Sequence, residues 1–438
     1  MWAKPPITMV WSWSFMNNDA PPDPVPDKTP EPIDPVLPAN PLPPSDDRLK
    51  QQPSMADPAD IPSVLPAEDD AADVLLAEPA PPKHRLSWYC LVLAGVTYIA
   101  CFVHGGELRL IAFAGLQSVP FVVLALFAYA GQRHVWARIV TLISLAIIVG
   151  LSGFLDFVLA LALKRREPWP ALVTFAGVVS AFLAAVICFA PRVRQQLGRL
   201  VPIDPTSFVH ATALATVTAL TINAFLPLIV LGEPPVVAIV ERVQQSRSQD
   251  SRDEDLRTQI YGTAWLVPTA FLVVGYPVRR GFRDTCQRLG LVRPRLWQVA
   301  FAIVAPGILL VAMHYFQWAT ERIWRISGWP VTDDKLLRAL FGGVANPLGA
   351  MAIGVAAGLG EELAVRGVLQ PRVGIFLSNL LFAALHAFQY HWDAVLGVFL
   401  FGLILAFIRK WTNTSTSALV HGLYDCLSLL LMYLGMEY

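Results

Sequence analysis

Apolar residues of this 438-residue chain are grouped in long, nearly uncharged blocks that polar loops separate. The blocks are about 18–25 residues long, the length that an α-helix needs to cross the ~30 Å hydrocarbon core of a bilayer. From Leu86 onward the pattern predicts about eleven spanning segments, near residues 86–103, 108–130, 135–163, 170–190, 208–231, 260–278, 296–318, 345–369, 374–390, 394–408 and 415–435. The predicted fold is all-α, a polytopic transmembrane helical bundle.

The composition supports a membrane protein. Hydrophobic residues make up 55% of the chain and charged residues 15%, whereas soluble domains contain about 45–50% and about 25%. A soluble chain of this length would form separate cores with charged surfaces between them. We therefore expect an integral membrane protein, in a bacterial inner (plasma) membrane.

The zero formal net charge hides an uneven distribution of charge. Residues 1–82 contain 14 acidic and 4 basic residues, and also 20 of the 36 prolines. Such a stretch buries too little apolar surface to offset the entropy of ordering, so residues 1–84 are predicted to form a disordered tail. A charged loop, 233–259, then separates an N-terminal transmembrane region, 85–232, with about five helices, from a C-terminal domain, 260–438.

Basic residues outside the tail lie mainly in short loops, where they indicate topology rather than nucleic-acid binding. The strongest cytoplasmic signal is a loop that contains Arg279, Arg280, Arg283, Arg288, Arg293 and Arg295. Counting from this loop places the N-terminal tail in the cytoplasm, together with the loops around Arg133, Arg194, Arg372 and Arg409. The run Lys164–Arg166 then falls outside, against the positive-inside rule.

Ionisable side chains inside a bilayer are costly and usually functional. The first cluster of them is Glu361, Glu362 and Arg366, late in a segment that is apolar from Leu348 to Leu359. On an α-helix Glu362 and Arg366 lie about 40° apart, as an i,i+4 pair that can neutralise itself. Glu361 points about 100° away from Glu362 and needs another partner. The non-functional alternative is a helix end in the headgroup region, where these side chains are solvated.

Two further clusters follow on later predicted helices. Phe382 and His386 are one helical turn apart, and so are His421 and Asp425. A lone intramembrane histidine is more often a hydrogen-bonded core residue than a catalyst or a ligand, so the argument depends on three clusters in adjacent helices. The helical rise places Glu361, His386 and His421 roughly 13, 18 and 9 Å above the inner ends of their segments, so one pocket can hold them.

The three clusters together resemble a known family. The order EExxxR, then FxxxH, then Hxxx followed by Asn or Asp is similar to the CAAX-prenyl-protease and bacteriocin-processing (CPBP) family of intramembrane endopeptidases. The matching residues are Glu361, Glu362, Arg366, Phe382, His386, His421 and Asp425. The flanking sequences RGVLQPR and RLGLVRP are also similar, so the resemblance covers about residues 260–438. It implies hydrolysis of peptide bonds in membrane-associated substrates by a Glu/His-activated water.

The resemblance also implies roles for individual residues. Glu361 and His386 activate water, and a carboxylate in a low-dielectric pocket is a usable base. His421 and Asp425 orient groups or stabilise the oxyanion. The supporting residues are Glu362, Arg366 and Phe382.

Asp425 occupies a position where the side chain matters for the mechanism. An asparagine amide can donate to an oxyanion, whereas an ionised aspartate cannot. Asp425 is therefore protonated, orients His421, or ligates a metal. A zinc-dependent protease is the mechanistic alternative, with Glu361, His386, His421 and Asp425 as ligands. Because the chain lacks H-E-x-x-H and each helix contributes one histidine, we predict hydrolysis without a cofactor.

Two other classes of function compete with the peptidase. A non-catalytic membrane scaffold or binding protein could use the same fold, with the extra N-terminal helices docking partners. A channel or transporter would show a pair of broken helices in matching halves, which the sequence does not show. The expected partners are the lipid bilayer and a peptide or protein substrate, without nucleic acid. The sequence does not distinguish prenylated CAAX proteins from bacteriocin leaders or other membrane peptides, and it does not indicate an oligomeric state.

Overall fold

The computed structural model describes residues 86–438 apart from 165–167, 238, 240–248, 334–343 and 437–438. Every regular element in this part of the chain is a helix, and it contains no β-strand. The predicted tail, residues 1–84, lies outside the described residues, as does part of the predicted charged loop.

Eight helices among the described residues are long and apolar enough to cross a membrane. Their bounds are Gly106–Gly131, Val135–Leu163, Trp169–Ile187, Phe208–Leu231, Leu296–Ile326, Pro347–Phe388, Trp392–Trp411 and Thr414–Tyr433. They confirm the predicted all-α transmembrane bundle. The protein is thus an integral membrane protein built of helices.

The eight helices divide the chain differently from the prediction of about eleven spanning segments, first at the start of the bundle. The segment predicted at 86–103 forms helix α2 (Leu86–His104), which has 19 residues. Within α2, the stretch Val92–His104 is counted as a shorter apolar helix. The prediction of an apolar helix at this position is therefore confirmed.

The second difference is the segment predicted at 260–278. The chain there forms α10 (Gln249–Ala264) and α11 (Leu266–Val273), followed by a turn. Gly275 in this turn has a φ of +106°, a conformation that favours glycine. The backbone therefore reverses inside a run of apolar residues, which a hydropathy pattern alone does not reveal.

The third difference concerns the segments predicted at 345–369 and 374–390, which lie in one helical run, Pro347–Phe388, on either side of a break. This run is interrupted at Gly374, where φ is +79° and ψ is 173°. It consists of α15 (Pro347–Glu362), the π-helix η3 (Leu363–Leu369) and α16 (Gln370–Leu385). The short 3-10 helix η4 (His386–Phe388) ends it.

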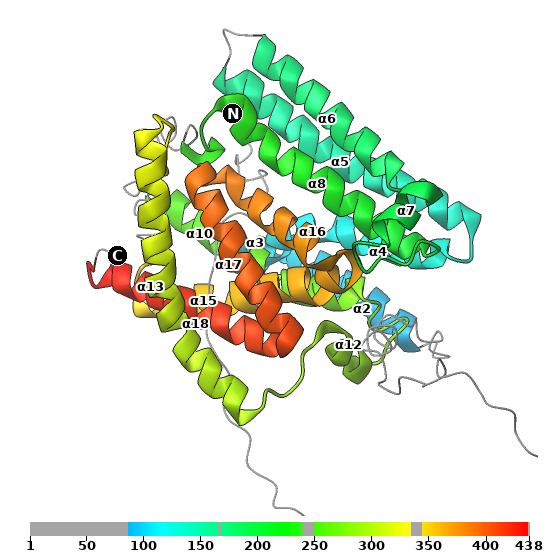
Figure 1. Ribbon diagram of the computed structural model, residues 1–438. Coiled ribbons are helices and arrows are strands. Elements are labelled where there is room, and N and C mark those ends of the chain that lie inside the picture. The colour runs from blue at the N-terminus through cyan, green and yellow to red at the C-terminus, as the bar shows by residue number, and fades with distance from the viewer. Residues whose placement is uncertain (1–85, 165–167, 238, 240–248, 334–343, 437–438) are drawn as a thin grey trace, which may run out of the picture. The chain divides into compact units, whose positions relative to one another are not determined.

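In the N-terminal region, α5 (Val135–Leu163), α6 (Trp169–Ile187) and α8 (Phe208–Leu231) lie side by side (Figure 1). One face of α8 has small, fully buried residues, including Ala211, Ala215 and Ala219. Small residues at i, i+4 and i+8 let helix backbones approach closely in a membrane.

The three-helix layer also contacts the C-terminal domain, because α8 packs against α16. Leu214 and Ala215 of α8 share a buried core with Val373 and Leu381 of α16. The N-terminal helices are therefore joined to the helices that carry the three clusters.

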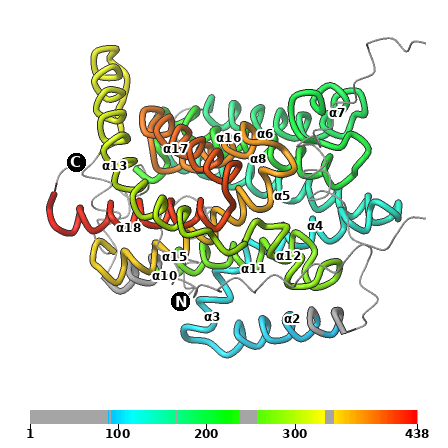
Figure 2. The backbone as a smooth tube through the Cα atoms, turned by 60° about the horizontal axis from the view of Figure 1, so that its bottom comes forward, coloured from blue at the N-terminus to red at the C-terminus, as the bar shows by residue number. Residues whose placement is uncertain are grey.

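The C-terminal domain places α18 (Thr414–Tyr433) between α13 (Leu296–Ile326) and α15 (Figure 2). Side-chain caps define where two of its helices begin. Asn346 accepts a hydrogen bond from the Gly349 backbone N–H before α15, and Asn413 accepts one from Thr416 before α18. The remaining long helix of the domain, α17 (Trp392–Trp411), packs against α16 and α18.

Candidate active site

The first cluster lies where α15 changes into the π-helix η3. Small residues on α15 allow its end to pack tightly, and a Cβ on Gly360 would clash with the Thr263 carbonyl oxygen. Glu361 is 6% exposed and Glu362 is 0% exposed as a result. π-Helical turns are rare and occur often at functional sites. The two glutamates are thus buried inside the bundle and not in contact with the headgroups as solvated side chains.

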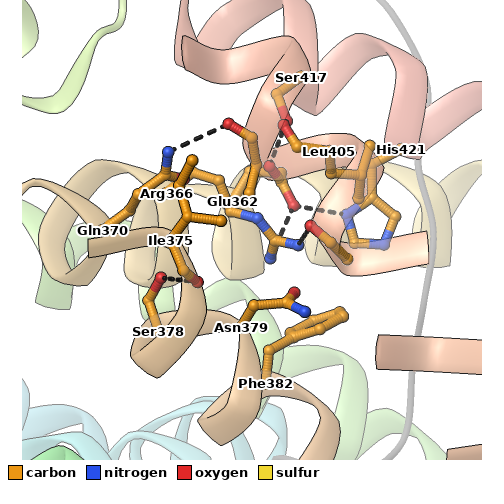
Figure 3. Close-up of polar contacts among 12 residues, drawn as sticks. Glu362, Arg366, Gln370, Ile375, Ser378, Asn379, Phe382, Leu405, Ser417 and His421 are labelled. Atoms are coloured by element: carbon orange, nitrogen blue, oxygen red, sulfur yellow. Dashed lines mark hydrogen bonds and ion pairs between the residues drawn. The ribbon is translucent and has the colours of Figure 1, made fainter. Parts of the chain in front are cut away.

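Glu362 contacts three buried side chains (Figure 3). Its Oε1 lies 3.2 Å from Arg366 Nη1 and 3.0 Å from His421 Nδ1. Its Oε2 accepts a hydrogen bond from the Ser417 hydroxyl. The predicted i,i+4 pair with Arg366 is therefore present, and Glu362 additionally joins α15 to α18. The sequence reasoning missed Ser417, although it lies one turn before His421 and so on the same helix face.

Arg366 is fully buried and extends the network towards α17 and α16. Its Nη2 donates to the Gly402 carbonyl oxygen at 2.9 Å, and its guanidinium lies 4.5 Å from the centroid of the Phe382 ring. This approach requires glycine at position 402, because a Cβ there would clash with Asn379 Oδ1. Asn379 in turn donates to the Phe399 carbonyl oxygen at 2.7 Å, which holds α16 against α17.

The Phe382 ring lies close to both histidine rings. Its centroid is 4.8 Å from that of His386 and 6.2 Å from that of His421. The ring therefore lies beside the guanidinium of Arg366 and both imidazoles. Its role as a supporting residue stays a prediction.

His386 is 2% exposed, and its Nδ1 lies 2.8 Å from the Phe382 carbonyl oxygen. A carbonyl oxygen only accepts hydrogen bonds, so the proton of the neutral imidazole is assigned to Nδ1. Nε2 then has a free lone pair. It is buried and has no hydrogen-bond partner among the described residues. The geometry thus presents His386 Nε2 as an acceptor.

Glu361 Oε2 and Asp425 Oδ2 are also among the buried atoms that have no hydrogen-bond partner in the described part of the chain. Asp425 Oδ2 lies 3.7 Å from His421 Nε2, which is beyond hydrogen-bond distance. Buried polar atoms are rarely left unsatisfied, so each such atom needs an explanation.

Electrostatic contacts show that the predicted residues converge. Glu361 interacts with Glu362, Arg366 and Asp425. His386 interacts with His421 and Arg366. The three sequence clusters therefore form one buried polar site, as the helix depths predicted.

The described residues contain no group of three or more His, Cys, Asp and Glu side chains arranged to hold a metal ion. Nδ1 of His421 already faces the Glu362 carboxylate, and His386 Nδ1 faces a carbonyl oxygen. Glu361, His386, His421 and Asp425 lie in one site but do not form such a group. Metal independence stays a prediction.

The fold and the site together define a helical membrane protein that contains a buried cluster of carboxylate and imidazole side chains. Residues 343–427 match the family model described as type II CAAX prenyl endopeptidase Rce1-like. This match supports assignment of residues 343–427 to the CPBP/CAAX protease family of intramembrane endopeptidases. A search among curated proteins and a search among solved structures give no match.

The family match covers a narrower stretch than the resemblance seen in the sequence, which extended over about residues 260–438. It contains all seven residues of the three clusters, and it ends two residues after Asp425. The helices of the N-terminal region lie outside the matched residues.

Proposed function

We propose that the protein is an intramembrane endopeptidase in which Glu361 and His386 activate the water that attacks the peptide bond. The observation that carries this proposal is the pair of buried atoms, Glu361 Oε2 and His386 Nε2, that lack a partner among the described residues. A water between a carboxylate oxygen and an imidazole lone pair would satisfy both atoms and be polarised for attack. Both residues lie in the region that matches a peptidase family.

In the proposed reaction, Glu361 accepts one proton of the water as the water oxygen bonds to the scissile carbonyl carbon. His386 Nε2 accepts a hydrogen bond from the other O–H and orients the nucleophile. The C–N bond then breaks, and the proton held by Glu361 passes to the leaving amine. The products are a carboxylic acid and an amine, and Glu361 returns to its ionised form.

His421 and Asp425 serve the oxyanion in this proposal. A tetrahedral intermediate needs a hydrogen-bond donor at its oxygen. A proton on Asp425 Oδ2, which lies 3.7 Å from His421 Nε2, supplies that donor. Glu362 orients the His421 ring through Nδ1, as a carboxylate does in hydrolase triads. Arg366 compensates the charge of Glu362.

The substrate class follows from the position of the site among membrane helices. We propose membrane-associated peptides or proteins as substrates, without a metal or other cofactor. Because the matching family is described by CAAX prenyl endopeptidases, prenylated peptides that end in a CAAX sequence are the first substrates to test. We further propose that the protein lies in a bacterial inner membrane, with its N-terminal tail and the Arg279–Arg295 loop in the cytoplasm.

The experiment compares proteoliposomes that contain the wild-type chain or Glu361→Gln. Each is incubated with a prenylated CAAX peptide, with the same peptide lacking the prenyl group, and with an extract of native membrane proteins, and cleavage is followed by mass spectrometry. We expect new peptide termini with the wild type and none with Glu361→Gln. Identical peptide patterns for both, across all three substrate sets, would favour the non-catalytic scaffold.

A further inference from the structure

Arginine side chains from four segments come together at one end of the bundle, outside the candidate active site. Arg288 belongs to α12 (Phe282–Leu289), and it interacts electrostatically with Arg280, Arg372 and Arg409. We call these four residues the arginine cluster. Arg372 and Arg409 are far in sequence from Arg280 and Arg288, so only the tertiary structure assembles the cluster.

Two members of the cluster are deeply buried. Arg288 is 5% exposed and Arg372 is 6% exposed. Arg288 Nη1 donates to the Gly367 carbonyl oxygen at 3.1 Å. Arg372 donates to the Val368 carbonyl oxygen at 2.9 Å and to the Tyr129 hydroxyl at 2.7 Å. All of these acceptors are uncharged.

No ion pair between a carboxylate and Arg288 or Arg372 occurs among the described residues. The hydrogen bond to Gly367 engages Nη1 of Arg288. Burial, and then the neighbouring Arg372, holds the pKa of the Arg288 guanidinium well below its usual range. Buried charges are normally paired, so two buried arginines whose hydrogen-bond acceptors are all uncharged are suited to an anion.

The surroundings of the cluster indicate which anion it meets. The Gly290 carbonyl oxygen, just after α12, accepts a hydrogen bond from Thr414 N–H at the start of α18. Asn413 bonds to Gln298 in the first turn of α13. Exposed tryptophans flank these helix ends, with Trp297 54% and Trp411 73% exposed. Tryptophan and arginine at helix ends mark the headgroup level of a bilayer, where the anionic groups are lipid phosphates.

We propose that the arginine cluster binds the phosphate of an anionic phospholipid headgroup. Basic sites between transmembrane helices at the cytoplasmic surface are suited to such headgroups. The bound phosphate accepts hydrogen bonds from Arg288 and offsets the repulsion between Arg288 and Arg372. Since these two arginines hold the Gly367 and Val368 carbonyl groups, the lipid also stabilises the π-helix that contains Arg366.

The test is lipid binding to the purified full-length protein in detergent, measured by native mass spectrometry and by the rise in thermal transition temperature on titration. The probes are phosphatidylglycerol, phosphatidylcholine and inorganic phosphate. Variants Arg288→Gln and Arg372→Gln remove the charge and keep an N–H donor for the backbone carbonyl. Arg283→Gln is the matched control, because Arg283 is exposed on the same helix.

We expect phosphatidylglycerol to bind more tightly than phosphatidylcholine, and each cluster variant to weaken that binding about fivefold. The control should bind like the wild type. Equal binding of the two lipids by the wild type would overturn the proposal, and this measurement needs no variant to fold. Unchanged lipid affinity in folded Arg288→Gln and Arg372→Gln would overturn it as well.

Two further outcomes distinguish other occupants from the lipid. Inorganic phosphate that displaces phosphatidylglycerol at equal concentration would identify a soluble anion as the ligand. Deletion of residues 1–82, which carry 14 acidic residues, is the second arm. If the wild type binds no lipid and the deletion variant does, the acidic tail occupies the cluster and the lipid assignment is wrong.

Discussion

Two adjacent glutamates in this protein have different surroundings. Glu362 contacts an arginine, a histidine and a serine, whereas Glu361 Oε2 has no hydrogen-bond partner among the described residues. A carboxylate that is fully engaged by protein groups is suited to positioning. A carboxylate with a free oxygen is suited to accepting a proton from water. Neighbouring residues of the same type thus have separate functions because the helix turns them towards different partners.

The first prediction concerns Glu361. Glu361→Gln keeps the size of the side chain but removes the base, so peptide cleavage should fall by about 10²–10⁴-fold, the usual contribution of general acid–base catalysis. His386→Ala should have a similar effect, because it removes the acceptor Nε2. Cleavage rate in proteoliposomes and folded yield by size-exclusion chromatography are the measurements.

The matched control for Glu361→Gln is Glu321→Gln. Glu321 pairs with Arg325 on an accessible part of α13, far in sequence from the three clusters. This variant should cleave at the wild-type rate. Wild-type turnover by Glu361→Gln would contradict the proposed base.

The second prediction concerns the buried pair of Glu362 and Arg366. Glu362→Ala leaves Arg366 without its charged partner, and breaking a buried pair typically costs about 3–5 kcal/mol. Both single variants should therefore accumulate poorly and melt at lower temperature, and the double variant should recover part of the loss. The exposed pair Glu321 and Arg325 is the control, since removing such a pair changes stability by about 0–1 kcal/mol. Full stability of both buried single variants would refute a structural function of the pair.

At the scale of elements, the close packing of α15, α16, α17 and α18 determines the geometry of the site. Short side chains make this packing possible at the points where helices cross. Gly402 on α17 is one such point, because Arg366, Phe382 and Asn379 all approach its Cα. The backbone break at Gly374, with φ of +79°, is another feature that only glycine adopts without strain.

The third prediction follows from this packing. In Gly402→Ala the new Cβ would clash with Asn379 Oδ1 and lie 2.9 Å from Phe382 Cδ1. Overpacking of this kind typically costs about 1–3 kcal/mol. The thermal transition temperature and the cleavage rate should both fall. Gly150→Ala on α5 is the control, since nothing lies within 4 Å of a Cβ at Gly150, and its stability should not decrease.

At the scale of the whole molecule, the candidate active site and the arginine cluster are connected through the π-helix. Arg366 in this helix contacts Glu362, while the neighbouring carbonyl groups of Gly367 and Val368 accept hydrogen bonds from the arginine cluster. The N-terminal helices take part in the same region, because Tyr129 of α4 (Val119–Gly131) contacts Arg372. The helices outside the family match therefore support the domain that the match identifies.

The fourth prediction concerns metal dependence of the whole protein. Nδ1 of His386 and Nδ1 of His421 each face a protein oxygen atom. The described residues contain no cluster of possible metal ligands. Purified protein should contain zinc well below one ion per chain, and cleavage should continue in phenanthroline. Elemental analysis and activity with and without the chelator are the measurements. Stoichiometric zinc, with chelator inhibition that added zinc reverses, would require a metal mechanism with Asp425 as a candidate ligand.

The amino-acid sequence by itself indicated the class of protein and the residues of the candidate site. Hydropathy blocks and intramembrane charges are local signals, so they indicated an all-helical membrane protein without knowledge of any contact. The spacing of Glu362 and Arg366 also predicted their ion pair, because residues i and i+4 are neighbours on any α-helix. The order of the three clusters was sufficient for the family resemblance, which the match to residues 343–427 confirms.

Only the tertiary structure decided how these residues are connected. Glu362 meets Ser417 and His421, which are 55 and 59 residues away, and no local pattern encodes a contact between helices at that separation. The turn at Gly275 also escaped the hydropathy pattern, because the segment predicted at 260–278 runs through it. The break at Gly374 falls where the predicted segments 345–369 and 374–390 meet, so the pattern placed the break but not its backbone conformation. The arginine cluster was visible in the sequence only as separate basic residues. Its character as a site depends on segments that meet in space, where packing buries Arg288 and Arg372.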